Sequence, residues 1–418
     1  MKKNYKEKKL SNGIKVYLYK DKNCKRIYAS YNVNYGSFGY YDKFYLKDKA
    51  YHVNPGMAHF LEHTLIEHSS FGNAIHYFMD KDLEFNGLTY PEVTSYYFLG
   101  IGDYKEPLEK LIEMIDKPCF TKENVDLVKH AVCEELKNVS DSKISIALTN
   151  NRRNVFANFD AAYENDNVLG SVETTKNITF EEVKACYDAY YNNENKFLVI
   201  GGNFDIDEII EFLEEIYKTI PYHPNEMKKY DYNDNFDVRK ELEIIEKPSD
   251  SDFAIVTYKL KKKDNENLNL LGMYIHLFNT MKFGYSSPLI DRLTKDEIVL
   301  NGLSSSCEVF KDAITITYST DTRNYEKLFE EIDKNLNVEN LNEKDFELIK
   351  KTMIVRELKK KDFIYSCFKS FPLTMEATKN IDDIKKVKEL NFEEFKKYID
   401  SLNFAIKTKT VVTNKKTN

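Results

Sequence analysis

Residues 53–73 read VNPGMAHFLEHTLIEHSSFGN and contain three of the eight histidines of this 418-residue chain. Pro55 and Gly56 punctuate the start of the stretch, and the polar run SSFGN closes it. The apolar segment between these signals is therefore predicted to be a helix. So much histidine on one short helix indicates either a metal site or a crowded packing surface.

The spacing of His59, Glu62 and His63 favours a metal site. On an α-helix, residues i and i+4 project from the same side, so the two imidazoles can reach one metal ion. Glu62 lies on that side too, within reach of a water molecule on the metal. Zinc favours imidazole nitrogen and carboxylate oxygen, and a catalytic zinc site keeps one position open for water. We interpret Glu62 as the general base for that water.

A catalytic zinc ion needs a third protein ligand. The next predicted helix that can supply it contains VKHAVCEELKN, residues 128–138. Glu134 and Glu135 are neighbours there, so only one of them can face the site. Alone, such a pair usually belongs to a solvated helix face, and it is the pairing with the histidine motif that makes one of them a candidate ligand.

The rest of the chain predicts an α+β fold. Strand and helix patterns follow one another in a similar order in both halves, which indicates two structurally similar domains, each a mainly antiparallel sheet flanked by helices. A polar segment that begins with two prolines near residue 221 interrupts this order. We therefore predict an N-terminal domain over 1–220, a linker over 221–238 and a C-terminal domain over 239–418.

Composition excludes several other classes of protein. The formal net charge is −7, so the chain lacks the basic footprint of a dedicated nucleic-acid binder. No stretch approaches the roughly 18 apolar residues of a membrane span, and no secretory signal is visible. Six scattered cysteines are typical of reduced thiols. These patterns predict a cytoplasmic protein. The cysteines are Cys24, Cys119, Cys133, Cys186, Cys307 and Cys367.

The two motifs together resemble those of the pitrilysin/insulinase family of zinc metallopeptidases, which includes the mitochondrial processing peptidases. That family combines H-x-x-E-H with a later segment similar to V-V-x-E-E-I, whose second glutamate is a ligand. The resemblance implies that His59, His63 and Glu135 bind one Zn²⁺ per chain and that Glu62 is the base. It also implies a two-domain half-clamshell unit, and such units act in pairs that enclose a chamber.

A third segment agrees with the same family. NGLTYPEVTSYYF, residues 86–98, resembles its N-A-x-T-x-x-x-x-T-x-Y segment, which borders the edge strand that pairs with the substrate backbone. The resemblance implies that an extended peptide adds to this edge as a strand. It makes Asn86, Thr89 and Tyr96 the candidate substrate-binding residues.

Two departures from the family pattern affect the predicted function. Val128 stands where the family usually has a supporting glutamate, and we interpret the nearby His130 as a surface residue. Active members also use an arginine and a tyrosine, spaced R-x6-Y, to stabilise the oxyanion. Here Arg292 is followed at that spacing by Val299, and Arg292 is interpreted as a surface charge. The resemblance therefore implies a heterodimer in which a second homologous subunit supplies the Arg/Tyr pair, with a homodimer as the alternative.

The residues that flank the histidine motif are interpreted separately. His68 lies five residues after His63, so it points away from the metal face and is assigned to the surface or to packing. Glu67 lies four residues after His63. It could orient the imidazole of that ligand or face solvent, and the sequence leaves both readings open.

These patterns predict a zinc-dependent endopeptidase subunit that hydrolyses short or unstructured peptides. Trimming of ribosomally made precursor peptides is a natural use for such an enzyme. The alternative is a non-catalytic family member that serves as a structural or peptide-binding subunit, which the missing Arg/Tyr pair motivates. A metal-binding protein without hydrolytic activity is a third, weaker reading.

Overall fold

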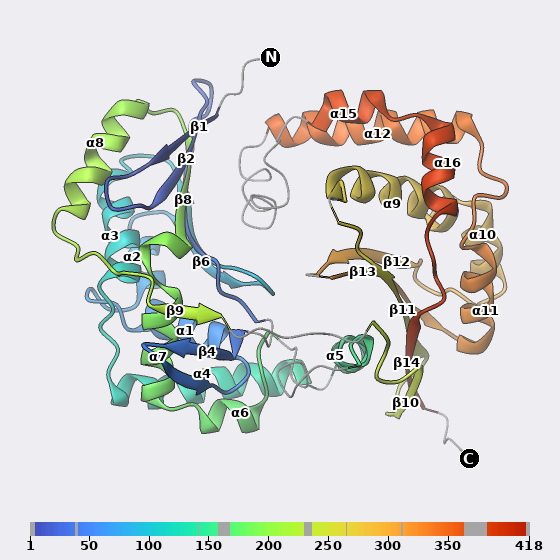
Figure 1. The fold of residues 1–418 in the computed structure, drawn as a ribbon, viewed down its shortest axis with the longest axis horizontal. Helices are drawn as coiled ribbons and strands as arrows, with labels where there is room; N and C mark the ends of the chain where they lie inside the picture. Colours follow the sequence, from blue (N-terminus) through green and yellow to red (C-terminus); the bar gives the residue numbers. More distant parts are fainter. Residues whose placement is uncertain are drawn as a thin grey trace. The chain divides into compact units, whose positions relative to one another are not determined.

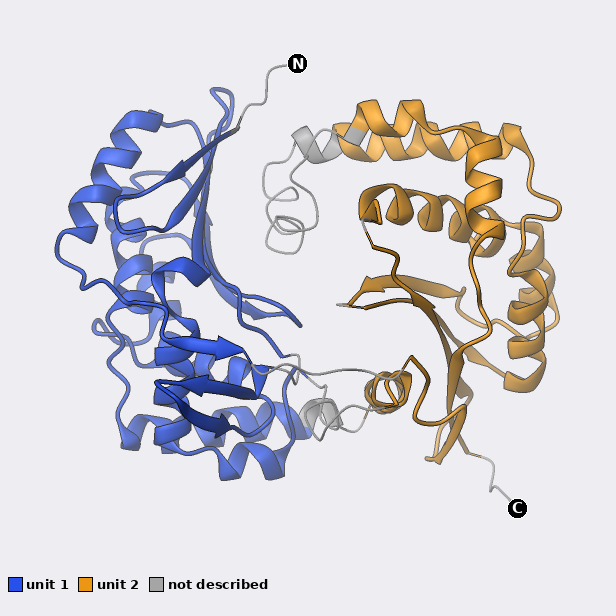
Figure 2. Ribbon diagram, viewed as in Figure 1, with its two compact units in different colours: residues 1–138, 161–232, 362–375 blue, residues 139–160, 233–361, 376–418 orange. Residues whose placement is uncertain are grey.

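The protein folds as α+β, as the sequence predicts, and its chain forms two compact units (Figure 2). A computed structural model describes residues 5–37, 41–140, 142–157, 168–229, 236–264, 266–310, 312–362 and 383–414. Unit 1 comprises residues 1–138, 161–232 and 362–375, and unit 2 comprises residues 139–160, 233–361 and 376–418.

Unit 1 is built on a six-stranded sheet with the order β1-β2-β8-β3-β7-β6 (Figure 1). Every neighbouring pair is antiparallel except β2 and β8. The central strands β3 and β8 are buried along their whole length, whereas β6 lies at the edge of the sheet. The strands are β1 (Tyr5–Lys9), β2 (Lys15–Lys20), β3 (Ile27–Val33), β6 (Glu84–Thr89), β7 (Thr94–Gly100) and β8 (Lys196–Gly202).

Helices pack against this sheet, and a small second sheet, β5-β4-β9, completes unit 1. The helix α1, predicted from its flanking signals, begins directly after Gly56. The φ of Gly56 is 88°, and a Cβ there would lie 2.7 Å from the carbonyl oxygen of Leu169, so this turn requires glycine. The helices are α1 (Met57–Glu67), α2 (Ala74–Met79), α3 (Lys105–Asp116), α4 (Lys122–Ser140), α6 (Val172–Asn177), α7 (Phe180–Tyr190) and α8 (Ile206–Tyr217). The short strands are β4 (Lys43–Leu46), β5 (Lys49–His52) and β9 (Met227–Lys229).

Unit 2 is built on a five-stranded sheet with the order β10-β14-β11-β13-β12. Its larger core lies between this sheet and a set of helices that includes α9, α10, α11 and α16. The strands are β10 (Leu242–Glu246), β11 (Asp252–Lys261), β12 (Ser304–Val309), β13 (Ala313–Thr322) and β14 (Lys407–Thr413). The helices are α5 (Lys143–Val155), α9 (Leu268–Phe283), α10 (Pro288–Lys295), α11 (Tyr325–Asn335), α12 (Glu343–Asp362), α15 (Asp383–Glu389) and α16 (Phe392–Asp400).

The two sheets share one topology, as the similar element order of the halves predicts. The order β10-β14-β11-β13-β12 corresponds strand by strand to β2-β8-β3-β7-β6. In each sheet the first of these pairs is parallel and the other three are antiparallel. In this five-strand order the second strand is β8 in unit 1 and β14 in unit 2, and each comes from near the end of its own half of the chain. The same five-strand frame is therefore built twice from different sequences.

The compact units differ from the predicted domain boundaries at residues 139–160 and at residues 362–375. Helix α5 falls within the predicted N-terminal domain, but it packs on the sheet of unit 2. Ala147 of α5 is fully buried against Phe253, Ile255 and Val412. Within the predicted linker 221–238, β9 pairs with β4 of unit 1, and residues 230–235 lie outside the described part of the chain.

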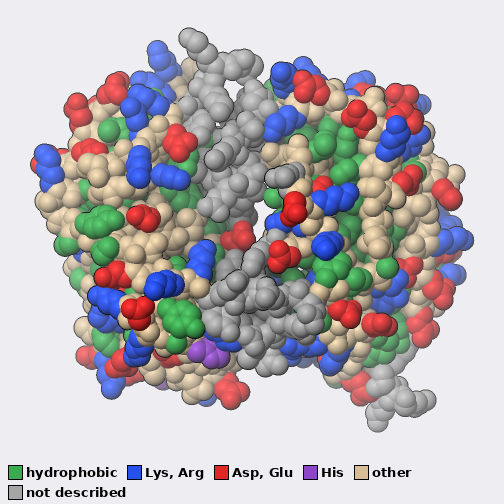
Figure 3. Space-filling view, viewed as in Figure 1, with side chains coloured by type: hydrophobic (Ala, Val, Ile, Leu, Met, Phe, Trp, Pro, Cys, Tyr) green, Lys and Arg blue, Asp and Glu red, His purple; other side chains and the backbone are tan. Residues whose placement is uncertain are grey.

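The distribution of surface charge and the state of the cysteines are those that the composition predicts. Basic and acidic side chains alternate over the face shown in Figure 3, without a large field of one sign. The five cysteines in the described residues are free thiols, and Cys367 lies outside those residues. No helix in the described residues is long and apolar enough to cross a membrane.

A buried ion pair joins the main sheet of unit 1 to its helices. Lys196 of β8 pairs with Asp116 at the end of α3, and each side chain is only 2% exposed. The hydroxyl groups of Tyr31 and Tyr217 donate to Asp116 Oδ2 over 2.8 and 3.1 Å. Three further elements, β3, β8 and α8, are thus held to one carboxylate on α3.

Replacing Asp116 with alanine is expected to lower the free energy of unfolding by about 3–5 kcal/mol, because it leaves the Lys196 ammonium buried and unpaired. The matched control is Glu106→Ala on the same helix. Glu106 forms an exposed pair with Lys81, so its loss should cost about 1 kcal/mol or less. Urea unfolding followed by far-UV circular dichroism measures both, and equal effects would contradict the assignment.

Candidate metal centre

Helices α1 and α4 of unit 1 bring His59, His63 and Glu135 together. One possible ligand atom from each side chain lies within 4.8 Å of the others. The histidines come from successive turns of α1, as their spacing predicts, and Glu135 comes from the middle of α4. In the described residues this is the one group of three or more His, Cys, Asp or Glu side chains that is arranged to hold a metal ion.

The separations within this group fit a zinc ion. Glu135 Oε2 lies 3.6 Å from His59 Nε2 and 3.4 Å from His63 Nε2. Zn–N and Zn–O bonds of about 2.1 Å at tetrahedral angles would place two ligand atoms about 3.4 Å apart. Both observed distances exceed the usual range of about 2.7–3.2 Å for a hydrogen bond. The three atoms therefore converge as metal ligands do, and their chemistry, two imidazoles and a carboxylate, is that of catalytic zinc sites.

Burial and charge act differently on the two imidazoles. Burial, together with the nearby His63, lowers the pKa of His59 to about 3, so its ring is neutral over the physiological range. Burial also lowers the pKa of His63, but the Glu67 hydrogen bond and the charges of Glu62, Glu67 and Glu135 outweigh it and raise that pKa overall. A neutral imidazole is the form that binds a metal, so His59 is already in its ligand state.

The side chain of Glu62 extends from α1 to the edge strand β6. Glu62 is 6% exposed, and Thr89 Oγ1 donates a hydrogen bond to Glu62 Oε2 over 2.5 Å. Gly87 on the same strand makes room for it, because a Cβ at Gly87 would lie 2.4 Å from Glu62 Oε1. Burial raises the pKa of Glu62 to about 7, although Thr89 and His63 oppose this and Glu135 adds to it. That pKa suits a general base at neutral pH.

The three candidate substrate residues occupy different environments. Asn86 is exposed on β6, where a bound peptide strand could reach it. Thr89 is engaged with Glu62, so its side chain supports the carboxylate instead. Tyr96 is fully buried in β7, and its hydroxyl lies 2.7 Å from that of Tyr191. The side chain of Tyr96 therefore belongs to the core, and contact between Tyr96 and substrate stays a prediction.

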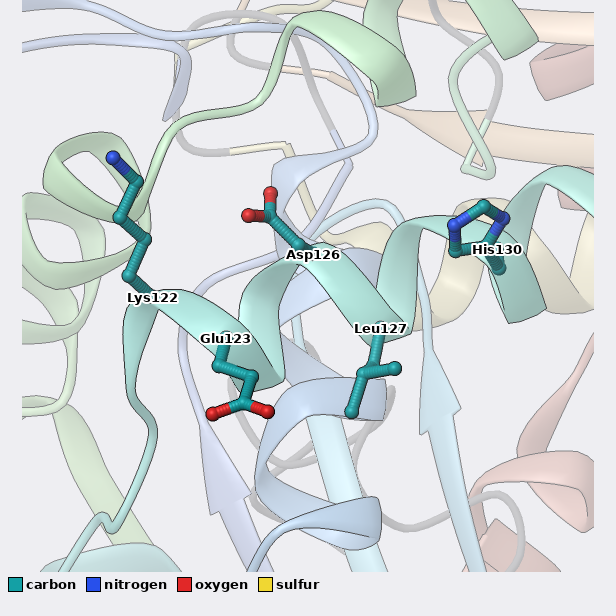
Figure 4. A pocket seen from close by; sticks show the side chains of 5 residues that line it. All are labelled: Lys122, Glu123, Asp126, Leu127 and His130. Carbon is teal, nitrogen blue, oxygen red and sulfur yellow. The ribbon is translucent and has the colours of Figure 1, made fainter.

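The other residues of α4 occupy the positions expected of surface and packing residues. Glu134 is exposed and pairs with Lys137, while Val128 is fully buried. His130 is exposed, as predicted, in a depression on the outer face of α4 (Figure 4). This depression includes none of the three clustered residues. It is lined by Lys122, Glu123, Asp126, Leu127 and His130.

The residues that flank the histidine motif, His68 and Glu67, and the candidate oxyanion residue Arg292 differ in their contacts. His68 caps the C-terminus of α1 outside the cluster, whereas Glu67 Oε1 lies 2.9 Å from Nδ1 of His63. Arg292 of α10 is bound to Glu331 of α11 and is half-exposed, as expected of a surface charge. Val299 is fully buried. The sequence left Glu67 open, and its i+4 spacing from His63 was the signal that could identify this contact.

Sequence comparison matches two family models to the chain. The model described as Insulinase (Peptidase family M16) matches residues 49–166, and the model described as Peptidase M16 inactive domain matches residues 177–353. Together they cover most of the chain.

Among curated proteins, the chain is similar to the uncharacterized zinc protease YmfH of Bacillus subtilis. The two are 29% identical over 245 residues, and this aligned part covers 56% of this chain and 55% of that protein. This chain is 23% identical over 174 residues to an uncharacterized zinc protease of Rickettsia felis, 40% of each chain. The chain thus spans about half the length of the curated relatives it matches.

Solved structures show the same fold at low identity. A putative M16-like peptidase from Alicyclobacillus acidocaldarius has a TM-score of 0.87 at 22% identity, with 98% of this chain and 97% of that chain covered. A protease from Helicobacter pylori has a TM-score of 0.81 at 14% identity, with 98% and 99% covered. These likenesses show the fold alone.

The raised pKa of Glu62 predicts a pH dependence of stability in the metal-free protein. The carboxyl holds its proton more tightly when folded than when unfolded, so its contribution is fully present below about pH 4.5 and is lost as the pH rises to about 7. The loss should reach up to about 3 kcal/mol. Urea unfolding in the presence of a chelator should show the wild type losing this stability relative to Glu62→Gln over the same pH range, because the titrations of His59 and His63 are common to both proteins.

Glu109→Gln, at an exposed position on α3, is the control and should leave the pH dependence of wild type in place. If the difference in stability between the wild type and Glu62→Gln stays constant between about pH 4.5 and 7, the assignment of this titration to Glu62 is wrong.

Proposed function

We propose, because the chain belongs to the insulinase family of peptidases (peptidase family M16), that it is the zinc-binding subunit of an endopeptidase. The observation that carries the proposal is the grouping of His59, His63 and Glu135 beside the buried Glu62 side chain, with Glu135 Oε2 3.6 and 3.4 Å from the Nε2 atoms of the two histidines. In this proposal the first three residues bind one Zn²⁺ ion and Glu62 is the general base.

The proposed reaction is the hydrolysis of a peptide bond by water. Bound zinc would lower the pKa of a water molecule to near neutrality and polarise the scissile carbonyl. Glu62 accepts a proton from the water as the oxygen forms its bond to the carbonyl carbon. Glu62 then delivers that proton to the amide nitrogen as the C–N bond breaks. The hydrogen bond from Thr89 keeps the carboxyl oriented through both transfers.

The edge strand β6 supports binding of substrate in an extended conformation. In the described residues β6 pairs only with β7, so its outer backbone groups can pair with a peptide. Gly87 and Thr89 face Glu62, so a peptide that pairs with this end of β6 lies beside the candidate metal centre. A folded protein cannot present such a strand without unfolding locally, so we propose that the substrates are short or unstructured peptides, with ribosomally made precursors as one natural class.

We propose that a second homologous subunit completes the site. Stabilising the oxyanion of peptide hydrolysis needs hydrogen-bond donors. Arg292 is bound to Glu331 and Val299 is buried, so neither offers a donor of that kind. A heterodimer in which the partner contributes an arginine and a tyrosine satisfies this need, and a homodimer is the alternative.

A second candidate function is a non-catalytic, peptide-binding or structural subunit. The observation that favours it is the match of residues 177–353 to a model described as an inactive domain. Retention of a buried Glu62 with a hydrogen-bonding partner favours the enzyme, because burying a carboxyl is costly and a peptide-binding surface has no need of one.

Glu62→Gln is expected to keep about one zinc ion per chain and to lose roughly 10²–10⁴-fold in turnover, because it removes the base and no ligand. His63→Ala should lose zinc and activity together. Bound zinc is measured by atomic absorption and turnover with a quenched, unstructured peptide, for the chain alone and together with any homologue encoded in the same genome. The mutation Glu134→Ala is the control and should change neither measurement.

Zinc-free wild type, or Glu62→Gln with full turnover, contradicts the proposed enzyme. Zinc binding without turnover in any pairing would favour the non-catalytic subunit.

If the substrate adds to β6 as a strand, the effect of modifying its backbone should alternate from one substrate residue to the next. In an added strand, alternate amide groups face β6 and the others face away. Peptides that carry a single N-methyl group at successive positions should therefore alternate between strong and weak loss of kcat/KM. Competition by the same peptides measures binding separately. Sensitivity that follows side-chain identity without alternation would contradict strand addition.

A further inference from the structure

Glu67, the last residue of α1, contacts one of the candidate ligands from the side away from the metal. Its Oε1 atom lies 2.9 Å from Nδ1 of His63. We infer that Glu67 is a positioning residue, which holds the His63 ring in the orientation and tautomer that zinc binding requires. The inference rests on the proposed function, since it concerns the same metal centre.

The two nitrogens of His63 face different partners. Nε2 lies 3.4 Å from Glu135 Oε2, within the group of converging ligand atoms. Nδ1 faces the Glu67 carboxylate. A carboxylate can only accept a hydrogen bond, so it keeps a proton on Nδ1 and leaves the lone pair of the neutral ring on Nε2. This is the arrangement in which carboxylates support zinc-bound imidazoles.

His63 needs this support more than His59 does. The His59 side chain is 8% exposed, so its surroundings hold the ring by packing. The side chain of His63 is 26% exposed, and packing restricts it less. Nδ1 of His59 is buried and has no hydrogen-bond partner in the described part of the chain. Of the two rings, therefore, only that of His63 is held by a carboxylate, and the carboxylate comes from its own helix.

Helix α4 does not provide an equivalent carboxylate. Val128, two turns before Glu135, is apolar and fully buried. Glu134 is exposed and paired with Lys137, away from the histidines. Among the described residues, Glu67 is thus the carboxylate that forms an ion pair with a candidate histidine ligand, apart from Glu135 itself. The support for the metal centre is supplied by α1.

The competing reading is an ordinary i, i+4 pair at the end of a helix. Such a pair stabilises the helix slightly and has no effect on a metal ion. The two readings differ in the affinity for zinc. A positioning residue changes it, and a helix-stabilising pair leaves it unchanged.

Zinc affinity is measured for the full-length chain by competition with a chromophoric chelator, using Zn²⁺ alone as the ligand. Glu67→Ala is expected to raise the dissociation constant about 10–100-fold. Glu67→Gln should lose less, because its amide oxygen can still accept from Nδ1–H. Glu134→Ala, which removes an exposed glutamate beside a ligand, should stay within about twofold of wild type. Circular dichroism verifies that each variant is folded.

A second measurement follows the ring directly. With ¹⁵N-labelled histidine, the metal-free wild type should show the His63 proton on Nδ1 once the ring is neutral, and Glu67→Ala should shift the proton towards Nε2. His63→Ala identifies the signal. A helix-stabilising pair would leave zinc affinity unchanged, so equal dissociation constants for wild type and Glu67→Ala overturn the inference while the proposed enzyme stands.

Wild type that binds no zinc would overturn the proposed function instead, and the tautomer of His63 would still test the contact with Glu67. If Glu67→Ala does not fold, Glu67→Leu, which also cannot accept from Nδ1–H, carries the test. A loss of zinc affinity in that variant, with no loss in Glu134→Ala, supports the inference, and an unchanged affinity contradicts it.

Discussion

The candidate metal centre depends on one constraint, which is that two buried side chains of α1, His59 and Glu62, must lie beside the partly exposed carboxylate of Glu135 on α4. His59 and Glu62 are both only 6% exposed, and burying such groups is costly without compensation. The compensation comes from nearby parts of the fold. Thr89 donates to Glu62, and Gly87 leaves space for the carboxyl. These two residues belong to β6, so the strand proposed to receive substrate is also the strand that accommodates the base.

The repeated frame shows that topology alone does not create this centre. The sheet of unit 2 repeats the strand order and the pattern of parallel and antiparallel pairs of unit 1. Yet α9, which follows β11, carries one histidine and no carboxylate. In the described residues no second cluster of candidate ligands accompanies the second sheet. Both units therefore place a helix beside an edge strand. Among the described residues, only unit 1 has a group of candidate metal ligands there.

Local geometry explains which parts of the site the sequence could predict. His59, Glu62 and His63 share a helix face because i, i+3 and i+4 spacing is a property of any α-helix. Glu135 depended on the family resemblance, because nothing in the adjacent glutamates shows which one faces α1. The motif could not show that Tyr96 is buried, because β7 is buried on both faces and the motif does not indicate on which side each residue lies. The placement of α5 on the sheet of unit 2 depends on contacts with residues more than 100 positions away, such as Phe253, which periodicity cannot reveal.

The charges around Glu62 give the metal centre a further property. Burial raises the pKa of this carboxyl to about 7, and the charge of Glu135 raises it further, so near neutral pH the metal-free protein holds a substantial part of Glu62 protonated. A divalent cation bound by Glu135 and the two histidines would offset the charge of Glu135 and attract the ionised form of Glu62. In the proposed enzyme, metal binding and ionisation of Glu62 would therefore be thermodynamically coupled, so that each favours the other. A base that ionises when the metal is present avoids an uncompensated buried charge in the metal-free protein.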